Sequence, residues 1–216
     1  MAIGGTAAGA GAQGGLGVFL SRGVTTNFYE AYDGTKSMIT GVDNTQDFVK
    51  IGAFSNHPLG LITNNVERVR ISAAGIVTTP YQPAFVAFAD SNQEPTTTTK
   101  IAYAGTNLNR GSHYNTTTSR FTAPVTGLYS FTVRWWYTIS ATTLAQMWLY
   151  KNGGALIETR FQPTAASPQY HTQLFKSTVY LVAGDYIEVF ATGGGSNSFH
   201  SSTSYTYSEF SGYLLG

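Results

Sequence analysis

The feature that most constrains the fold of this chain is a set of short segments in which apolar and polar residues alternate. In residues 129–135, Tyr, Phe, Val and Trp occupy every second position, and Ser, Thr and Arg lie between them. Residues 146–150 repeat the pattern and run into residues 151–154, whose Asn-Gly pair is typical of a tight hairpin. A period of two indicates strands, and no stretch has the apolar spacing of an amphipathic helix. The sequence therefore predicts an all-β fold.

The first folded section is predicted over residues 24–79. Its expected strands cover residues 27–32, 37–42, 48–54, 59–63, 68–72 and 76–78, with turn residues rich in Gly, Asn, Asp and Pro between them. A section this short encloses little core of its own. We expect it to form a small β-shaft that shares its core with identical chains.

The second section, residues 80–216, is predicted to be a globular head. Pro80 and Pro83 mark its start, because proline disfavours both helices and central strands. Further strands are expected at residues 177–181, 186–191 and 210–216, joined by turns. Many short strands at this spacing are typical of a sandwich or jelly roll.

Composition excludes several classes of function. The formal net charge is +1 and no basic run is present, so we expect no nucleic-acid partner. There is no cysteine, which excludes disulfides and thiolate metal sites, and no apolar run approaches a membrane span, so no membrane insertion is expected. Neither a nucleophile elbow nor a phosphate loop occurs. We expect no cofactor and no enzymatic activity.

Residues 1–23 form a segment rich in glycine and alanine, without charge from Ala2 to Ser21. It lacks the positive start of a signal peptide. Small residues let two backbones approach closely, so we expect an extended anchor that docks into another protein by strand addition. A solvated flexible tail is the alternative. The larger side chains available for anchoring are Ile3, Leu16, Val18, Phe19 and Leu20.

Histidines and carboxylates give little support for a catalytic or metal site. The four histidines are far apart in sequence, although copies of one histidine could meet on a threefold axis. Asp185 and Glu188 lie three residues apart, but Asp185 follows Gly184 in a predicted turn, where aspartate accepts hydrogen bonds from nearby backbone N–H groups. We therefore interpret Asp185 as structural.

Recognition is predicted to lie in three polar, aromatic loops at residues 105–113, 162–171 and 193–207. Loops rich in Tyr, Ser and Gly combine rigid aromatic surface with adaptable hydrogen bonding, although ordinary solvated loops share this composition. The candidate receptor-binding residues are Asn109, Arg110, His113, Tyr170, His171, His200, Tyr205 and Tyr207.

The tryptophans suggest either a carbohydrate platform or buried packing. Trp135 and Trp136 must lie on opposite faces of one strand, so one is expected in the core and the other on a trimer or ligand surface. Core or interface packing is the simpler interpretation. The candidates for core or trimer contacts are Phe121, Tyr129, Phe131, Trp135, Trp148, Phe210, Tyr213 and Leu215.

The head resembles the complement globular-head family, a branch of the tumour-necrosis-factor-like jelly rolls. The resemblance is carried, in order, by residues 85–88, 100–103, 120–131, 149–153, 181–189 and 210–215. It implies a jelly roll of about ten strands that packs as a homotrimer around a threefold axis. Some members bind calcium in apical loops, but no loop here has clustered Asp and Glu, so we do not carry that site over.

The first section resembles shaft segments of tailed-bacteriophage fibres, on residues 49–59 and on the string Thr63-Asn-Asn-Val-Glu-Arg-Val-Arg-Ile71. The resemblance implies a virion protein made in the host cytoplasm: a short trimeric tail or head fibre, or a needle tip. Its N-terminus would attach to another virion protein, and its tip would bind a host surface glycan or protein. A capsid decoration or cement protein is the alternative, and a glycan hydrolase is a more distant one.

Overall fold

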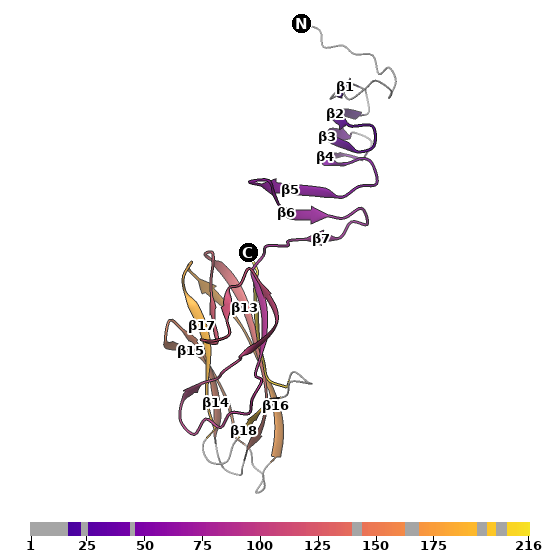
Figure 1. Ribbon diagram of the computed structural model, residues 1–216. Coiled ribbons are helices and arrows are strands. Elements are labelled where there is room, and N and C mark those ends of the chain that lie inside the picture. Colours follow the sequence, from indigo (N-terminus) through magenta and orange to yellow (C-terminus); the bar gives the residue numbers. More distant parts are fainter. Residues whose placement is uncertain are drawn as a thin grey trace. The chain divides into compact units, whose positions relative to one another are not determined.

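The computed structural model describes residues 17–22, 26–43, 46–139, 144–162, 169–193, 198–201 and 207–216 (Figure 1). All regular elements in these ranges are strands, which confirms the predicted all-β class. Within them there is no helix long and apolar enough to cross a membrane. The chain divides into two compact units, Met1–Pro80 and Tyr81–Gly216.

The first unit begins with a four-stranded antiparallel sheet in the order β1-β2-β3-β4. Its strands are β1 (Gly17–Arg22), β2 (Thr26–Tyr32), β3 (Ser37–Asp43) and β4 (Phe48–Ala53). The turn after β2 forms because Asp33 accepts hydrogen bonds from the backbone N–H groups of Thr35 and Lys36, at 2.9 and 2.7 Å. Gly34 supplies the positive φ of 96° that this turn needs.

The structure differs from the predicted division at residue 23. Residues 17–22 form a strand of the first sheet instead of an isolated extended segment, with Val18, Phe19 and Leu20 opposite Ala31, Glu30 and Tyr29 in β2. The backbone groups on one side of this strand are therefore paired within the chain, and its other side is an edge of the sheet. Residues 1–16, including the predicted anchor residues Ile3 and Leu16, lie outside the described part of the chain.

A three-stranded antiparallel sheet completes the first unit, with β5 (Leu59–Thr63), β6 (Val66–Ile71) and β7 (Val77–Thr78) in that order. Asn64 and Asn65 join β5 to β6 with φ angles of 51° and 57°, which asparagine tolerates better than most residues. The six predicted strands of this section correspond to β2–β7 within a few residues.

The second unit, hereafter the head, is a sandwich of two antiparallel sheets. Its first sheet has the order β10-β8-β19-β13-β16, and β18 pairs with β13. Consecutive strands of the sequence are mostly not neighbours in this sheet, as in a jelly roll. The bounds are β8 (Ala84–Phe88), β10 (Gly105–Arg110), β13 (Gly127–Ile139), β16 (Gln169–Leu181), β18 (Ser198–His200) and β19 (Glu209–Leu214).

The second sheet of the head has the order β11-β12-β17-β14-β15, and β9 pairs with β17. The Asn-Gly turn joins β14 to β15 as predicted, with φ of 52° at Asn152 and 81° at Gly153. The bounds are β9 (Thr99–Lys100), β11 (Tyr114–Asn115), β12 (Arg120–Thr122), β14 (Ala145–Lys151), β15 (Gly154–Phe161) and β17 (Tyr186–Thr192).

The core between the two sheets is largely aromatic. The ring of Phe85 stacks on Tyr114 and Phe121 with centroids 4.8 and 4.9 Å apart, and meets Phe210 edge-on at 4.9 Å. Phe121, Tyr129, Phe131, Trp135 and Phe210 are all fully buried. The other three proposed core or trimer residues lie elsewhere: Trp148 is half-buried, and Tyr213 and Leu215 are exposed.

The head has two distinct ends. At the entry end, the chain enters beside its own C-terminus: Gln82 Nε2 donates to the Leu214 carbonyl at 2.7 Å, and Leu128 N to the Gly216 carbonyl at 2.9 Å. At the opposite, far end, Ile139 pairs with Gln169 and Ala145 with Phe161. The last residues of β13, β15 and β17 and the first residues of β14 and β16 therefore lie at the far end.

Candidate recognition surface of the head

The outer face of the first head sheet is apolar at the entry end. Alternation along β13, β16 and β19 brings Leu128, Tyr180 and Leu215 into one row across three strands, since Leu128 pairs with Tyr180 and its carbonyl accepts from Leu215 N at 2.8 Å. The three side chains are 42, 59 and 48% exposed. Tyr213, one step further along β19, is 44% exposed. A single chain therefore leaves this row open to solvent.

The middle of the same face carries few charges. Arg134 and Glu209 lie opposite each other in β13 and β19 and form an ion pair at 3.5 Å. Leu174, opposite Arg134 in β16, is 63% exposed. Thr132 and Ser211 form the adjacent row. The ion pair offsets its own charges, and Lys176, opposite Thr132 in β16, adds an exposed positive charge to the centre of the face.

At the far end this face carries an aromatic patch, defined here as Trp136, Tyr170, His200 and Tyr207. Three rings surround the Trp136 indole: Tyr170 stacks on it with centroids 5.1 Å apart and planes 17° apart, and His200 and Tyr207 lie at 4.6 and 4.5 Å. Tyr170 is 67% exposed, and the other three side chains are half-buried. The patch therefore presents one exposed ring, that of Tyr170, which stacks on the half-buried Trp136 indole.

Strand register explains why these residues meet. Trp136 is opposite His200 of β18, and Thr138, two residues further on the same face, is opposite Tyr170 of β16. Thr138 Oγ1 and His200 Nε2 are hydrogen-bonded, and Ser208 Oγ donates to the His200 carbonyl at 2.8 Å. Partial burial lowers the pKa of His200, which favours the neutral form of its imidazole.

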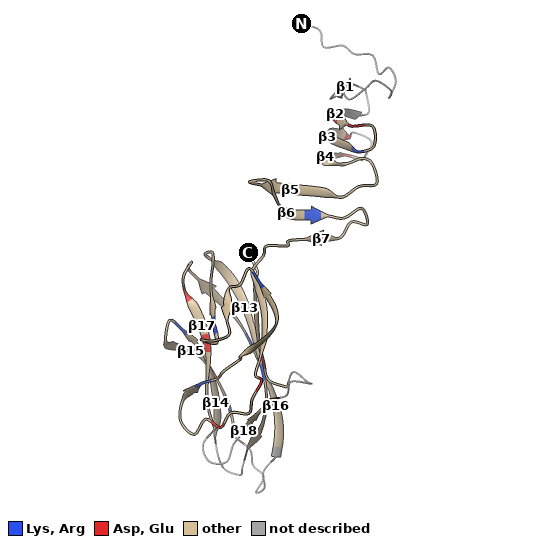
Figure 2. Cartoon of the chain, viewed as in Figure 1, with Lys and Arg blue, Asp and Glu red and all other residues tan. Residues whose placement is uncertain are grey.

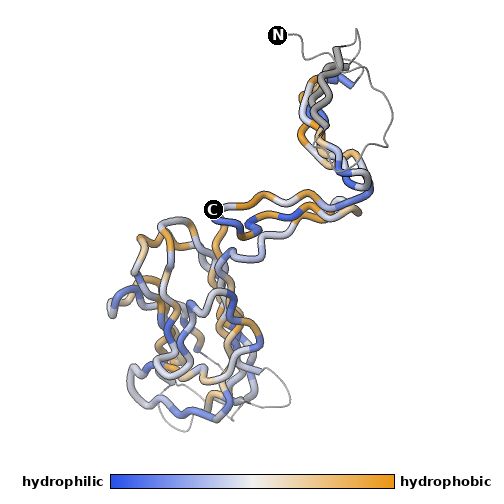
Figure 3. The backbone as a smooth tube through the Cα atoms, turned by 45° about the horizontal axis from the view of Figure 1, so that its top comes forward, coloured by the Kyte–Doolittle hydropathy of each residue, from blue (hydrophilic) through white to orange (hydrophobic). Residues whose placement is uncertain are grey.

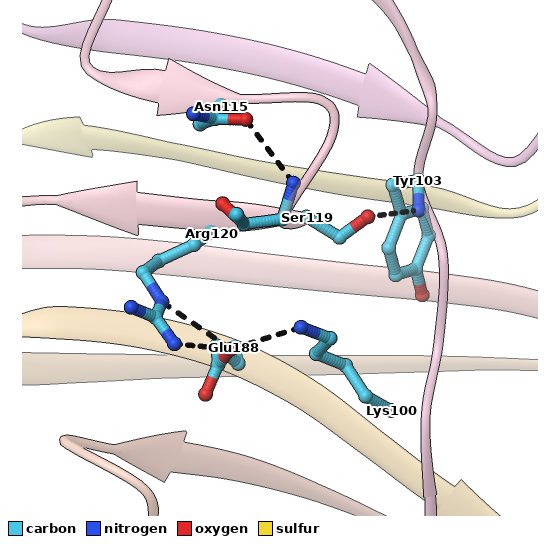
Figure 4. Close-up of polar contacts among 7 residues, drawn as sticks. Lys100, Tyr103, Asn115, Ser119, Arg120 and Glu188 are labelled. Atoms are coloured by element: carbon cyan, nitrogen blue, oxygen red, sulfur yellow. Dashed lines mark hydrogen bonds and ion pairs between the residues drawn. The ribbon is translucent and has the colours of Figure 1, made fainter.

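The outer face of the second sheet has a different character. Glu188, only 3% exposed, accepts hydrogen bonds from Lys100 Nζ at 3.4 Å and Arg120 Nη2 at 3.1 Å (Figure 4). The Arg120 guanidinium also lies 3.7 Å above the Tyr186 ring. At the edge of this sheet, Glu158 pairs with Arg160 at 2.5 Å. Charged residues are sparse in the chain as a whole, and Figure 2 marks their positions along the chain.

The turn between β16 and β17 is held by Asp185, as the sequence analysis expected for a structural role. Its carboxylate pairs with Lys151 Nζ at 2.8 Å, and accepts hydrogen bonds from Asn152 Nδ2 at 2.7 Å and the Val182 N–H at 2.8 Å. These contacts, with Lys151 the largest, lower the pKa of Asp185 to about 2. Asp185 therefore ties two turns of the sandwich together.

The structure brings together three of the predicted recognition residues, Tyr170, His200 and Tyr207, and places the others elsewhere. The predicted loop at 105–113 contains strand β10. In this strand, Asn109 Nδ2 donates to the Tyr114 carbonyl at 2.8 Å, and Asn109 Oδ1 accepts a hydrogen bond from the Tyr114 N–H at 3.1 Å. Arg110 ends β10, and His113 lies in the turn that follows. His171 faces the interior beside the rings of Tyr137 and Phe161. Tyr205 lies outside the described residues.

Trp136 is the member of the patch that was not among the predicted recognition residues. Its signal was present in the sequence, because alternation requires Trp135 and Trp136 to face opposite ways. What the sequence lacked was the pairing of β13 with β18, which is separated from it by about sixty residues and which brings His200 to Trp136.

Within the described ranges no group of three or more His, Cys, Asp or Glu could hold a metal ion. Glu188, the buried carboxylate of the head, is already engaged by two cations. The apolar row and the aromatic patch both lie open on the outer surface of the described part of the head. This arrangement suits binding through surface complementarity.

Comparisons with known proteins agree with the geometry. The model of the C1q domain family matches residues 84–215. Among solved structures, the Eiger tumour-necrosis factor of S. frugiperda matches with a TM-score of 0.50 and 14% identity, covering 62% of this chain and 93% of that chain. The globular domain of zebrafish complement 1qA protein matches with a TM-score of 0.46 and 12% identity, covering 62% and 98%. A search of curated proteins finds no match.

Proposed function

The chain belongs to the C1q domain family, and on that premise we propose that it is a homotrimeric, non-enzymatic binding protein. C1q and tumour-necrosis-factor-like domains are often trimeric and bind ligands. The observation that carries the proposal for this chain is the difference between the two outer faces of the head. One carries the apolar row together with a single ion pair and the exposed Lys176, and the other carries the ion pairs of Glu188 and Glu158.

The apolar row of Leu128, Tyr180 and Leu215 supports self-association. Exposed apolar side chains in a contiguous row favour burial, at roughly 25 cal/mol per Å² of apolar surface removed from water. Three copies that meet through this face around a common axis cover the row and leave the ion-paired faces in solvent. Oligomerisation would also supply stability that a chain without cysteine cannot obtain from disulfides.

Recognition is assigned to the aromatic patch at the far end. Tyr170 presents an amphipathic ring, and the neighbouring hydroxyl and imidazole groups of Thr138 and His200 add polar character beside it. Aromatic surface beside hydrogen-bonding groups suits a polar ligand such as a glycan or a polar protein surface. The far end is also the end of the head opposite to the chain entry.

At a finer level we propose that the protein is a short fibre of a tailed-bacteriophage virion, with the head as its host-binding tip. The fibre-like string between Thr63 and Ile71 supports this assignment, and it forms the end of β5, the turn and strand β6 in the structure. In this proposal residues 1–23 attach the fibre to another virion protein, either through residues 1–16 or by adding a strand at β1. A capsid decoration protein is the competing assignment.

Oligomerisation is tested with two leucines of similar exposure on opposite outer faces. Leu128 is 42% exposed on the first sheet and Leu156 is 45% exposed on the second. Light scattering of the full chain is expected to give a trimer for the unmodified protein and for Leu156→Lys, and dissociation for Leu128→Lys. A monomeric unmodified chain at micromolar concentration overturns the proposal.

Binding is tested with fluorescent full-length trimer on a glycan array, on intact bacterial cells and on emptied capsids. Tyr170→Ala is expected to lower binding to glycans or cells at least tenfold. Tyr150→Ala, which removes a tyrosine stacked on Phe190 on the opposite outer face, serves as the control and leaves binding unchanged. Binding to capsids alone would support the decoration protein and contradict the fibre. Loss of the trimer in Tyr170→Ala would assign the patch to the interface.

A further inference from the structure

Residues 89–93, here called the strap, follow β8 in the head and lie beside β18. After Ala89, the strap consists of the polar residues Asp90, Ser91, Asn92 and Gln93. Figure 3 shows hydrophilic stretches of this kind, drawn in blue, in the connections of the head as well as in its strands. A hydrophilic segment has little apolar surface to bury, so hydrogen bonds determine where the strap lies.

The strand beside the strap is the shortest of the strands that build the aromatic patch. β18 supplies His200 from a run of three residues, whereas β13 and β16 supply Trp136 and Tyr170 from runs of thirteen. β13 pairs with β16 along its whole length, but it pairs with β18 over three residues. A short strand is held by few bonds of its own sheet, so the position of His200 depends on further contacts more than that of Tyr170 does.

A reciprocal pair of backbone hydrogen bonds joins β18 to Gln93 of the strap. The Phe199 N–H donates to the Gln93 carbonyl at 2.7 Å, and the Gln93 N–H donates to the Phe199 carbonyl at 3.0 Å. Phe199 is 3% exposed, and its ring stacks on the buried Trp135. Because successive residues of a strand face opposite ways, fixing Phe199 between Trp135 and Gln93 also fixes His200 on the outer face.

Gln93 is itself held through its side-chain amide. Its Nε2 donates to the Ala102 carbonyl at 2.9 Å, and its Oε1 accepts a hydrogen bond from the Ala102 N–H at 2.7 Å. The neighbouring Ile101 N–H donates to the Val189 carbonyl of β17 at 2.9 Å. Both polar ends of the amide are therefore bonded to a segment that is tied to the second sheet, and Gln93 links this segment to β18 of the first sheet.

Two further contacts hold the strap along the same strand. Asn92 Oδ1 accepts a hydrogen bond at 2.8 Å from the N–H of Ser201, the residue after His200. At the start of the strap, the Ala89 N–H donates to the Ser208 carbonyl at 3.1 Å, and Ser208 Oγ donates to the His200 carbonyl. With the Gln93 pair, the strap is therefore bonded to the residues before and after His200.

We propose that Gln93 is a positioning residue of the aromatic patch, whose amide holds β18 so that the His200 imidazole stays against the Trp136 indole. The inference rests on the proposed recognition function of the patch, and it adds a residue outside the patch to that function. Gln93 acts through Phe199 and His200 instead of touching the ligand. Tyr170 is supplied by β16, so it is expected to keep its place when Gln93 is replaced.

Gln93→Met tests this role, because methionine has a similar length and cannot make either hydrogen bond to Ala102. Ala102 is exposed, so water can replace both bonds and the head is expected to stay folded. The matched control is Gln82→Met at the entry end, which removes the bond of another half-buried glutamine to a backbone carbonyl, that of Leu214 at 2.7 Å. Both variants are expected to keep the oligomeric state of the unmodified chain and to melt at similar temperatures.

The first measurement is hydrogen–deuterium exchange of the full chain. We expect Gln93→Met to raise the exchange rate of the Phe199 N–H about tenfold, because the strap that accepts its hydrogen bond is no longer held. Gln82→Met is expected to change that rate less than twofold, and exchange along β13 should stay the same in both variants. An unchanged rate at Phe199 in Gln93→Met overturns the positioning role.

The second measurement follows the imidazole Cε1–H signals of the four histidines by NMR, with that of His200 assigned from its loss in His200→Gln. The Trp136 and Tyr170 rings lie 4.6 and 5.5 Å from the His200 ring, so their ring currents shift this signal. Gln93→Met is expected to move the His200 signal and to leave that of His171, which β16 supplies, in place. The control variant should move neither, and a His200 signal that stays in place in Gln93→Met overturns the inference.

Binding of the fluorescent full chain to the glycan array and to intact bacterial cells connects this role to function. Gln93→Met is expected to lower binding about fivefold, because a recognition site loses affinity when its supporting residues loosen. If Tyr170→Ala lowers binding and Gln93→Met does not, the recognition patch stands and the positioning role is overturned. If neither variant lowers binding, the recognition patch and its positioning residue are both overturned.

Discussion

Trp135 and Trp136 are consecutive residues of β13 that lie in opposite environments. The Trp135 indole is completely buried and stacks on Phe199 at 4.8 Å and on Tyr137 at 4.3 Å. The Trp136 indole lies on the outer face and stacks on Tyr170 at 5.1 Å. One peptide bond therefore separates a residue that stabilises the sandwich from a residue that supports the proposed recognition patch.

This relationship predicts separable effects of the two substitutions. Trp135→Ala should lower the free energy of unfolding by about 3–5 kcal/mol, because it empties a fully buried site. Trp136→Ala should cost about 1 kcal/mol, and it should lower ligand binding by removing the base under Tyr170. Urea denaturation at one fixed protein concentration measures the first effect. Equal destabilisation by both variants would contradict the assignment of Trp136 to the outer face.

Trp135→Phe adds a sharper comparison. The buried Trp135 Nε1 has no hydrogen-bond partner among the described residues, so the indole N–H contributes a desolvation cost without a compensating bond. Phenylalanine keeps an aromatic ring against Phe199 and removes that cost. We expect Trp135→Phe to lower the free energy of unfolding by less than half the loss caused by Trp135→Ala.

Glu188 is predicted to matter more than any exposed ion pair of the head. Its side chain is 4% exposed and is shared by Lys100 and Arg120, whose side chains are 37 and 35% exposed. Glu188→Gln leaves two cations beside a buried amide, but both can turn toward solvent, so we expect a loss of about 2 kcal/mol in the free energy of unfolding. The matched control, Glu158→Gln in an exposed pair, should lower the free energy of unfolding far less, because solvent screens that pair.

Local pattern was sufficient to predict most of the strands. Alternation located β13, β14, β17 and the six strands β2–β7, and the Asn-Gly pair located the β14–β15 hairpin. The division of the tryptophans between two faces followed from the same period of two. These features depend on neighbours in sequence, so a single sequence contains them.

The structure differs from the expectations drawn from the sequence where pairing between strands far apart in the sequence decides the fold. Residues 105–110 are polar and lack alternation of apolar residues, yet they form β10 because β8 offers a free edge for pairing. Residues 17–22 are paired by β2 in the same way. The aromatic patch also depends on such pairing, because Tyr170 and His200 reach Trp136 from strands that begin more than thirty residues further along the chain.

Gly212 is predicted to tolerate no side chain. A Cβ atom there would lie 2.6 Å from Phe131 and 2.8 Å from Phe85, both fixed in the core. Gly212→Ala should therefore lower the free energy of unfolding by about 1–3 kcal/mol through overpacking. Gly154→Ala is the matched control in a strand of the other sheet, where the nearest atom would be the Lys151 carbonyl oxygen at 3.6 Å. In thermal melts, Gly212→Ala should unfold at a lower temperature than Gly154→Ala. Identical melting temperatures would show that the core around Gly212 can rearrange to accommodate a methyl group.

Asp185 is predicted to give the head a stability that acid removes. Contacts with Lys151, Asn152 and the Val182 N–H lower its pKa to about 2 in the folded chain, whereas an unfolded aspartate has a pKa of about 3.9. Because the folded pKa is the lower one, the carboxylate stabilises the fold fully above about pH 4, and this contribution is lost as the pH falls toward 2.

The Asp185→Asn variant isolates that contribution, since asparagine can still accept the hydrogen bond from Val182 but carries no charge for Lys151. The unmodified head should be the more stable of the two at pH 7, and the difference should shrink between about pH 4 and pH 2, where protonation removes the charge from Asp185 as well. Urea denaturation of both proteins across this range measures the difference. If the difference in the free energy of unfolding between the two proteins stays constant down to pH 2, the turn is stabilised by hydrogen bonding alone, without a contribution from the ion pair.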